Sequence, residues 1–200
     1  MRKVIVSVFA TMDGVQQDPH EWSLEYATAE YEAYARDQLF AADALLMGRV
    51  TYQGFAESWP SMSDDGPASD DFTRRINTMP KYVVSTTLDD VSWTNSALLK
   101  GDVVEAVREL RRQPGRDILM FGCGGLARTL TRHDLVDEIR VWIHPVVLGR
   151  GESLFTGWSE TRFRLTGTKT FASGVVVLAH EPVAADAGAA VAGAPPTARR

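Results

Sequence analysis

The segment DILMFGCGGLA, residues Asp117–Ala127, joins an apolar run to a glycine-rich turn and to the start of a helical pattern. The run Ile118–Phe121 is typical of a buried strand. Gly122, Gly124 and Gly125 permit positive φ angles and bring backbone N–H groups close to an anion, which the dipole at a helix N-terminus also favours. A strand, a glycine turn and a helix in this order predict an α/β fold, with a tight turn that holds no ligand as the alternative.

The spacing Gly122-x-Gly124-x-x-Ala127 also matches the fingerprint of the Rossmann dinucleotide-binding fold. That fingerprint opens a long nucleotide-binding half, whereas the residues that follow Ala127 are few and mainly strand-like. The late position of the turn therefore argues against a standard Rossmann domain.

Strand-like and helix-like segments alternate along the rest of the chain, which predicts a mixed, mostly parallel sheet with helices on both faces. Ser173–Gly174 predicts an antiparallel hairpin near the end, and Ser58–Ser69 predicts a loop that ends in a helix N-cap at Ser69. Strands are expected at Lys3–Phe9, Ala44–Met47, Lys81–Thr86, Asp117–Phe121, Glu138–His144, Phe163–Phe171 and Val175–His180. Helices are expected at Ala29–Phe40, Arg49–Phe55, Asp70–Asn77, Asp102–Arg112 and Leu126–Leu130.

Length and composition predict one cytoplasmic domain. Residues 1–182 form the expected folded unit, and the Ala/Gly/Pro-rich residues 183–200 are expected to be a disordered tail. The net charge of −5 gives no basic footprint for nucleic acid, and no apolar run is long enough to cross a membrane. A single cysteine, Cys123, and scattered histidines predict neither a disulfide nor a metal site.

Two further strand ends carry groups that suit an anion. ALLMGRVTY (44–52) places Gly48, Arg49 and Thr51 at a helix start, and KYVVSTTL (81–88) places Ser85 and Thr86 after a strand. Each alone is better explained by an ordinary helix start or a Ser/Thr turn. Because parallel strands bind ligands at their carboxyl ends, the three ends together predict a phosphate-rich dinucleotide site.

These segments, together with SVFATMDG (7–14) and LVDEIRVWIHPVVLGRGESLF (135–155), resemble the dihydrofolate-reductase-like family over about residues 2–181. They are most similar to the reductase domain of the bifunctional deaminase–reductase of riboflavin biosynthesis. The resemblance implies a three-layer α/β fold and an NADPH-dependent reductase that acts on a small heterocyclic or sugar-derived substrate. It also implies a homodimer, for which the apolar stretch Val136–Leu148 is the candidate interface. The zinc-binding pattern of a deaminase half is missing.

The resemblance also assigns cofactor contacts by position. Gly48, Arg49 and Thr51 match the adenosine-side phosphate site, and Ser85 and Thr86 match the segment beside the ribose 2′-phosphate, which favours NADPH over NADH. The pyrophosphate turn and the nicotinamide amide position are matched by Gly122, Gly124, Gly125, Leu126 and, for the amide, Ala10.

Catalytic and substrate-binding candidates have weaker support. Asp13 is the candidate for polarising the substrate or relaying a proton, and an ordinary Asp–Gly turn explains it equally well. Glu32 stands nearest to the helix carboxylate of folate-reducing members, but a solvated helix face explains it better, which leaves a pteridine or dihydrofolate-type reductase and a non-catalytic NADP-binding protein as alternatives. Pocket-lining candidates, which core or dimer packing also explains, are His20, Trp22, Phe55 and Trp59.

Overall fold

The protein is described by a computed structural model that covers residues 1–62 and 70–183. Ser69, the expected N-cap, and most of the expected tail lie outside the described residues. The other elements can be compared with the sequence-based expectations one by one.

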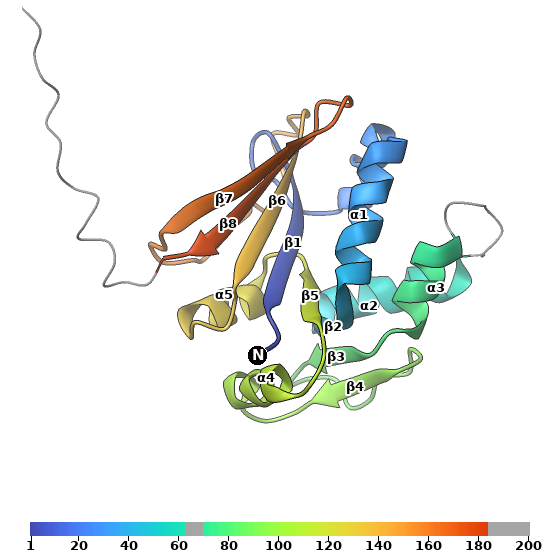
Figure 1. Cartoon of the computed structure of the whole chain (residues 1–200), viewed down its shortest axis with the longest axis vertical. Helices are drawn as coiled ribbons and strands as arrows, with labels where there is room; N and C mark the ends of the chain where they lie inside the picture. Colours follow the sequence, from blue (N-terminus) through green and yellow to red (C-terminus); the bar gives the residue numbers. More distant parts are fainter. Residues whose placement is uncertain (63–69, 184–200) are drawn as a thin grey trace, which may run out of the picture.

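One twisted sheet runs through the molecule, in the order β4-β3-β2-β5-β1-β6-β8-β7 (Figure 1). The first six strands of this order are parallel, whereas β8 is antiparallel to both β6 and β7. This confirms the mixed sheet and the hairpin at its edge. The strands are β1 (Val4–Thr11), β2 (Ala42–Gly48), β3 (Lys81–Val84), β4 (Ser96–Leu99), β5 (Asp117–Phe121), β6 (Glu138–His144), β7 (Phe163–Thr170) and β8 (Val176–Pro182).

Helices cover both faces of the sheet and enclose two main apolar clusters. Alternate residues of β1 point to opposite faces, so that Val6 and Val8 pack against α4 and α5, whereas Ile5 packs with α1, α2 and α3. The helices are α1 (Ala29–Ala41), α2 (Arg49–Ser58), α3 (Asp70–Thr78), α4 (Val103–Arg112) and α5 (Gly125–Arg132), with short 3-10 turns η1 (Pro19–Glu21), η2 (Leu24–Tyr26) and η3 (Trp59–Ser61).

The differences from expectation are local. β4 was not expected, because Ser96–Leu99 is a four-residue edge strand with neither a long apolar run nor an alternating pattern. The expected loop at Ser58 begins later, since α2 and η3 continue to Ser61. At α4 the helix begins at Val103, one residue after the expected start, because Asp102 is its N-cap and the Asp102 carboxylate accepts hydrogen bonds from the N–H groups of Val104 and Glu105.

Most apolar side chains of Val136–Leu148, the stretch expected at a dimer interface, are buried inside the protomer. Val136, Ile139, Val141 and Trp142 are buried in the core. Within the rest of this stretch, up to Leu148, Val147 is the one large apolar side chain that is clearly exposed. The homodimer stays a prediction, but this stretch offers it little surface.

Ser7 is the centre of a buried polar network that joins α1 to the sheet. Its Oγ accepts hydrogen bonds from Gln38 Nε2 and Trp142 Nε1, both at 3.0 Å. Gln38 in turn accepts a bond from Arg140 on β6. The network fixes the distance between α1 and β1 because a buried donor without a partner is costly.

We predict that Ser7→Ala lowers the free energy of unfolding by about 1–3 kcal/mol, because it leaves two buried donors unpaired. Ser96→Ala is the matched control, since the Ser96 hydroxyl is buried and has no hydrogen-bond partner among the described residues; its removal leaves no other group unpaired, so this variant should not lose stability. Urea denaturation measures both variants. Equal losses for the two serines would show that the network contributes nothing.

Candidate cofactor-binding site

The predicted strand ends converge at the carboxyl edge of the sheet. Gly48 is the register partner of Val84, so the β2–α2 turn lies directly beside the Ser85 segment. A Cβ on Gly48 would lie 3.8 Å from Leu126 Cβ, and one on Gly122 would lie 3.8 Å from Thr51 Oγ1. The turn that leads into α2 and the turn that leads into α5 are therefore in contact.

Both of these helices begin without a side-chain cap. Gly48 is the N-cap of α2 and Gly124 is the N-cap of α5, and no side chain of the described residues caps either helix start. By contrast, Thr28 caps α1 and Asp102 caps α4. Two adjacent helix N-termini thus present unpaired backbone N–H groups and positive dipole ends at one place, which is the arrangement that binds phosphate groups.

In the turn that leads into α5, Gly122 and Gly124 are suited to their positions for different structural reasons. Gly122 has φ +80°, which favours glycine, and its N–H donates to the backbone oxygen of Ser7 at 2.9 Å. Gly124 has an ordinary backbone conformation, and a Cβ there would meet no atom within 4 Å. Open space at the helix start, rather than backbone strain, is what glycine provides at position 124.

The polar candidates at this edge, Arg49, Ser85 and Thr86, differ in their exposure and in their hydrogen bonds. Arg49 is exposed at the start of α2, and within the described part of the chain its guanidinium bonds only to Gln53 Oε1, at 2.9 Å. Ser85 is buried, and its Oγ accepts the N–H groups of Thr87 and Leu88, as in a Ser/Thr turn. Ser85 therefore shapes the loop, in which Thr86 and Thr87 are both exposed and the Thr87 hydroxyl lies 3.4 Å from Ser85 Oγ.

Asp13 joins the loop after β1 to the loop after β6. Its exposed carboxylate accepts hydrogen bonds from Thr11 Oγ1 and from the N–H groups of Leu148 and Gly149. The bonds from Thr11 and Gly149 lower the pKa of this carboxyl below its ordinary value. Asp13 is thus an ionised acceptor that holds two loops together. Ala10, the predicted nicotinamide neighbour, is buried two residues before the loop starts, near the end of β1.

The aromatic candidates separate into two groups. Phe55 and Trp59 are half-buried, and Phe55 lies with its ring centre 5.5 Å from that of Phe121, the last residue before Gly122. Phe9 and Phe121 lie on the same face of the sheet, because Phe121 pairs with Ser7 on β1. Phe9 and Phe121 were missed as site residues, although each directly precedes a segment that the sequence singled out.

The remaining candidates do not join this group. Glu32 is exposed on the first turn of α1, and His20 is exposed on η1. Trp22 is buried, with its indole N–H donating to the backbone oxygen of Gln17. Its ring meets His144 edge-on, with the ring centres 5.2 Å apart.

His144 ends β6 inside an aromatic cluster and was not expected to matter. It is fully buried, its Nε2 lies 3.4 Å from the Tyr31 hydroxyl, and its ring also contacts Phe9 and Tyr26. Burial lowers the pKa of His144, an effect that hydrogen bonds to the backbone of Trp142 and Ala10 partly offset. The ring is therefore neutral in the folded protein.

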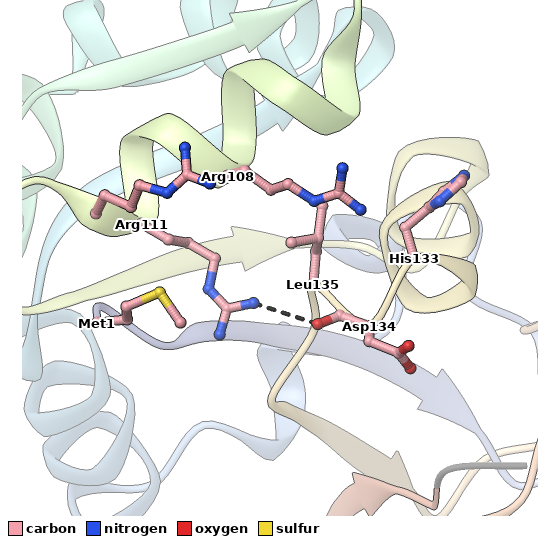
Figure 2. Close-up of a pocket in the computed structure, with 7 residues that line it drawn as sticks. Met1, Arg108, Arg111, His133, Asp134 and Leu135 are labelled. Carbon is pink, nitrogen blue, oxygen red and sulfur yellow. Dashed lines mark hydrogen bonds between the residues drawn. The ribbon is translucent and has the colours of Figure 1, made fainter.

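A separate cavity of about 270 Å³ lies away from the glycine turns, between the C-terminal half of α4 and the turn after α5 (Figure 2). Arg111 is buried here and donates to the Asp137 carboxylate and to the backbone oxygens of Asp134 and Arg2. Arg108 and Arg112 pair with glutamates one turn earlier on α4. Helices α4 and α5 both end at this cavity. Because the C-terminus of a helix carries a partial negative charge, arginine side chains are favourable there, which explains the positive charge of the cavity.

Other kinds of site find no support in the part of the chain that the structure describes. It contains no group of three or more His, Cys, Asp or Glu residues that could hold a metal ion. No described helix has the length and apolar character to span a membrane. Cys123 is buried, which raises the pKa of its thiol to about 12 and removes it as a nucleophile.

Comparison with solved structures defines the class of fold. The chain superposes on a Shewanella sp. PV-4 protein assigned to riboflavin biosynthesis with a TM-score of 0.69, at 21% identity, over 90% of this chain and 99% of that one. It superposes on the dihydrofolate reductase of Enterococcus faecalis, solved with NADP(H), with a TM-score of 0.55, at 12% identity, over 90% and 96% of the two chains. The fold is therefore dihydrofolate-reductase-like, as the sequence predicted.

Sequence comparison places the chain within that class. The model of the RibD C-terminal domain family matches residues 2–177, and the chain belongs to this family. A curated relative, the uncharacterized protein YyaP of Bacillus subtilis, is 29% identical over 181 residues, which cover 90% of this chain and 94% of that protein.

We predict that stability falls as the pH drops below the ordinary histidine pKa of about 6.5, because unfolding then allows His144 to bind a proton that the folded state rejects. Above this pH neither state is protonated, so the contribution of His144 is constant. The titratable groups that face the ring, Tyr26 and Tyr31, have raised pKa values and stay neutral throughout. The loss should approach about 1.4 kcal/mol per pH unit.

Urea denaturation between about pH 7.5 and 5 measures this slope. His144→Gln should flatten it whatever its effect on overall stability, whereas the exposed control His133→Gln should keep the slope of the parent protein. An unchanged slope in His144→Gln would assign the pH dependence to other groups.

Proposed function

We propose that this protein is an NADPH-dependent reductase that transfers hydride to a small heterocyclic or sugar-derived substrate, as in the reductase step of riboflavin biosynthesis. The observation that carries the proposal is the contact between two uncapped helix N-termini at the carboxyl edge of the sheet, with Gly48 and Gly124 as their N-caps. Membership in the RibD C-terminal domain family supports the reductase class.

The residues at this edge fit a phosphorylated dinucleotide. The free N–H groups that follow Gly124 and Gly48 suit pyrophosphate and adenosine-side phosphate oxygens. Arg49 has no acidic partner among the residues that the structure describes and is available for a charge-assisted bond, with Thr51 beside it. Thr86, held by the Ser85 turn, faces solvent where a 2′-phosphate would distinguish NADPH from NADH.

NADPH would supply the hydride, and the chain supplies position and electrostatics. The backbone near Ala10 is the proposed neighbour of the nicotinamide amide. Phe9, Phe55 and Phe121 present half-buried rings on one face of the sheet, which suits a planar heterocyclic substrate. Because its carboxylate is committed to backbone N–H groups, Asp13 acts in this proposal by holding the substrate-side loop rather than by donating a proton.

A non-catalytic NADP-binding protein is the second candidate. It is favoured by the exposed position of Glu32 and the low pKa of Asp13, which leave the two predicted catalytic carboxylates without a clear proton-donating role. The same position of Glu32 weakens the case for a dihydrofolate-type reductase. The homodimer follows from the resemblance and the cytoplasmic location from length and composition, and both stay predictions.

Cofactor titration followed by a substrate panel tests the proposal. The purified protein should bind NADPH more tightly than NADH, and the absorbance of the reduced nicotinamide should fall with a pyrimidine or pteridine substrate. Tight NADPH binding without oxidation across the panel would favour the non-catalytic candidate. Failure to bind either nucleotide would reject both.

We predict that Arg49→Ala weakens NADPH binding by about 1–3 kcal/mol, through the loss of a charge-assisted contact to phosphate. Isothermal titration calorimetry measures the change. Arg74→Ala is the matched control, because Arg74 is an exposed arginine on α3 with a single acidic partner. Equal affinities of Arg49→Ala and the parent protein would remove Arg49 from the site.

We predict that Gly124→Val abolishes NADPH binding while leaving the protein folded. A Cβ at position 124 would meet no atom of the described residues within 4 Å, so the substitution fills the open space proposed for the pyrophosphate. Gly54→Val is the control, since Gly54 is equally open and lies away from the helix start, in the middle of α2. A folded Gly124→Val variant with parental affinity would place the cofactor elsewhere.

A further inference from the structure

The loop after β1 is attached to its surroundings by three side chains, and only one of them reaches the glycine turn. Asp13 bonds to the N–H groups of residues 148 and 149, and Gln17 Oε1 accepts the N–H of Glu152 at 3.0 Å. Gln16 differs, because its Oε1 accepts the N–H of Cys123 at 3.2 Å. Cys123 lies between Gly122 and Gly124, within the proposed pyrophosphate turn.

The loop and the turn have no other hydrogen bond between them in the described part of the chain. The backbone of Gln16 donates to the Glu152 oxygen, and Val15 forms a β-bridge with Ser153. These contacts hold the loop against the segment after β6. The hydrogen bond to the turn is made by one amide side chain, that of Gln16. That bond is part-buried, so water competes with it less than at an open surface.

We infer that Gln16 is a positioning residue that couples occupancy of the glycine turn to the order of the loop Met12–Gln17. The inference rests on the proposed function. Phosphate groups bound at the N-terminus of α5 restrict the turn Gly122–Gly125, and the restricted Cys123 N–H then holds Gln16 more firmly. Asp13 and Gln17 fix the rest of the loop to residues 148–152. The bond between Gln16 and Cys123 therefore lets a bound cofactor order the loop on the substrate side of the site.

The coupling has a reciprocal consequence. If a bound cofactor orders the loop through Gln16, the ordered loop strengthens cofactor binding by the same factor. A single net hydrogen bond corresponds to about a two- to tenfold change in an equilibrium constant. Loss of the Gln16 acceptor should therefore weaken NADPH binding by a factor in that range, far less than Gly124→Val.

Hydrogen exchange with and without NADPH tests the inference, using Gln16→Met and the matched control Gln17→Met. Both substitutions keep side-chain length and remove one acceptor, but only Gln16 contacts the turn. In the parent protein and in Gln17→Met, NADPH should slow exchange in residues 12–17 by about two- to tenfold. In Gln16→Met, NADPH should still protect residues 122–127 but should no longer slow exchange in the loop.

The outcomes separate this inference from the proposed function. Equal protection of the loop in Gln16→Met and the parent protein would overturn the role of Gln16. Protection of the turn without protection of the loop in the parent protein would also overturn it, while leaving the cofactor site intact. If NADPH protects neither segment of the parent protein, the proposed function fails and the coupling fails with it.

Discussion

Parallel pairing of β2 with β5 is the constraint on which the candidate site depends. The register Leu45↔Leu119 brings the ends of the two strands to the same edge, and the turns after them then lead into α2 and α5 side by side. Glycine at both N-caps keeps side chains out of the space between the helix starts. A phosphate group placed there would meet backbone N–H groups from two chain segments that are far apart in sequence.

The polarity of the sheet also explains where the charged side chains lie. Helices α2 and α5 follow parallel strands directly and begin at the carboxyl edge, so their positive dipole ends gather there. At the other edge, arginines collect where α4 and α5 end (Figure 2). Arg111 and its partner Asp137 therefore stabilise the opposite edge of the sheet. The arginines at the cavity accompany helix C-termini, whereas the carboxyl edge has the N-termini of α2 and α5.

Much of the fold was predictable because its signals are local. The segment Asp117–Ala127 carries a buried strand, a turn and a helix start, and all three appear in the structure. The preceding helix, expected to start at Asp102, is also present, with Asp102 as its N-cap. The edge strand β4 was missed because a short edge strand has no periodic pattern of its own. The proximity of Gly48, Thr51, Gly122 and Leu126 was predictable only by assuming parallel strands, since no local signal places turns from separate strands together.

The substrate side was less predictable, because side-chain direction there depends on tertiary packing. Trp22 and His144 carry no mark in the sequence that separates a core residue from a pocket residue, and the structure buries both in one aromatic cluster. Asp13 was open to two readings, and its bonds to Leu148 and Gly149 involve residues more than a hundred positions away. Gln16 contacts Cys123 across a similar separation. Such contacts appear only once the loops after β1, β5 and β6 are folded together.

The most direct test of the shared site is to follow backbone amide signals by NMR while NADP⁺ is added. The account predicts that the amides that open α2, from Arg49 to Thr51, and those that open α5, from Gly125 to Ala127, shift together with one dissociation constant. Signals around Arg108 and His133 should stay in place. Shifts confined to one of the two helix starts, or centred on the arginine-lined cavity, would contradict the claim that two adjacent helix N-termini hold a single dinucleotide.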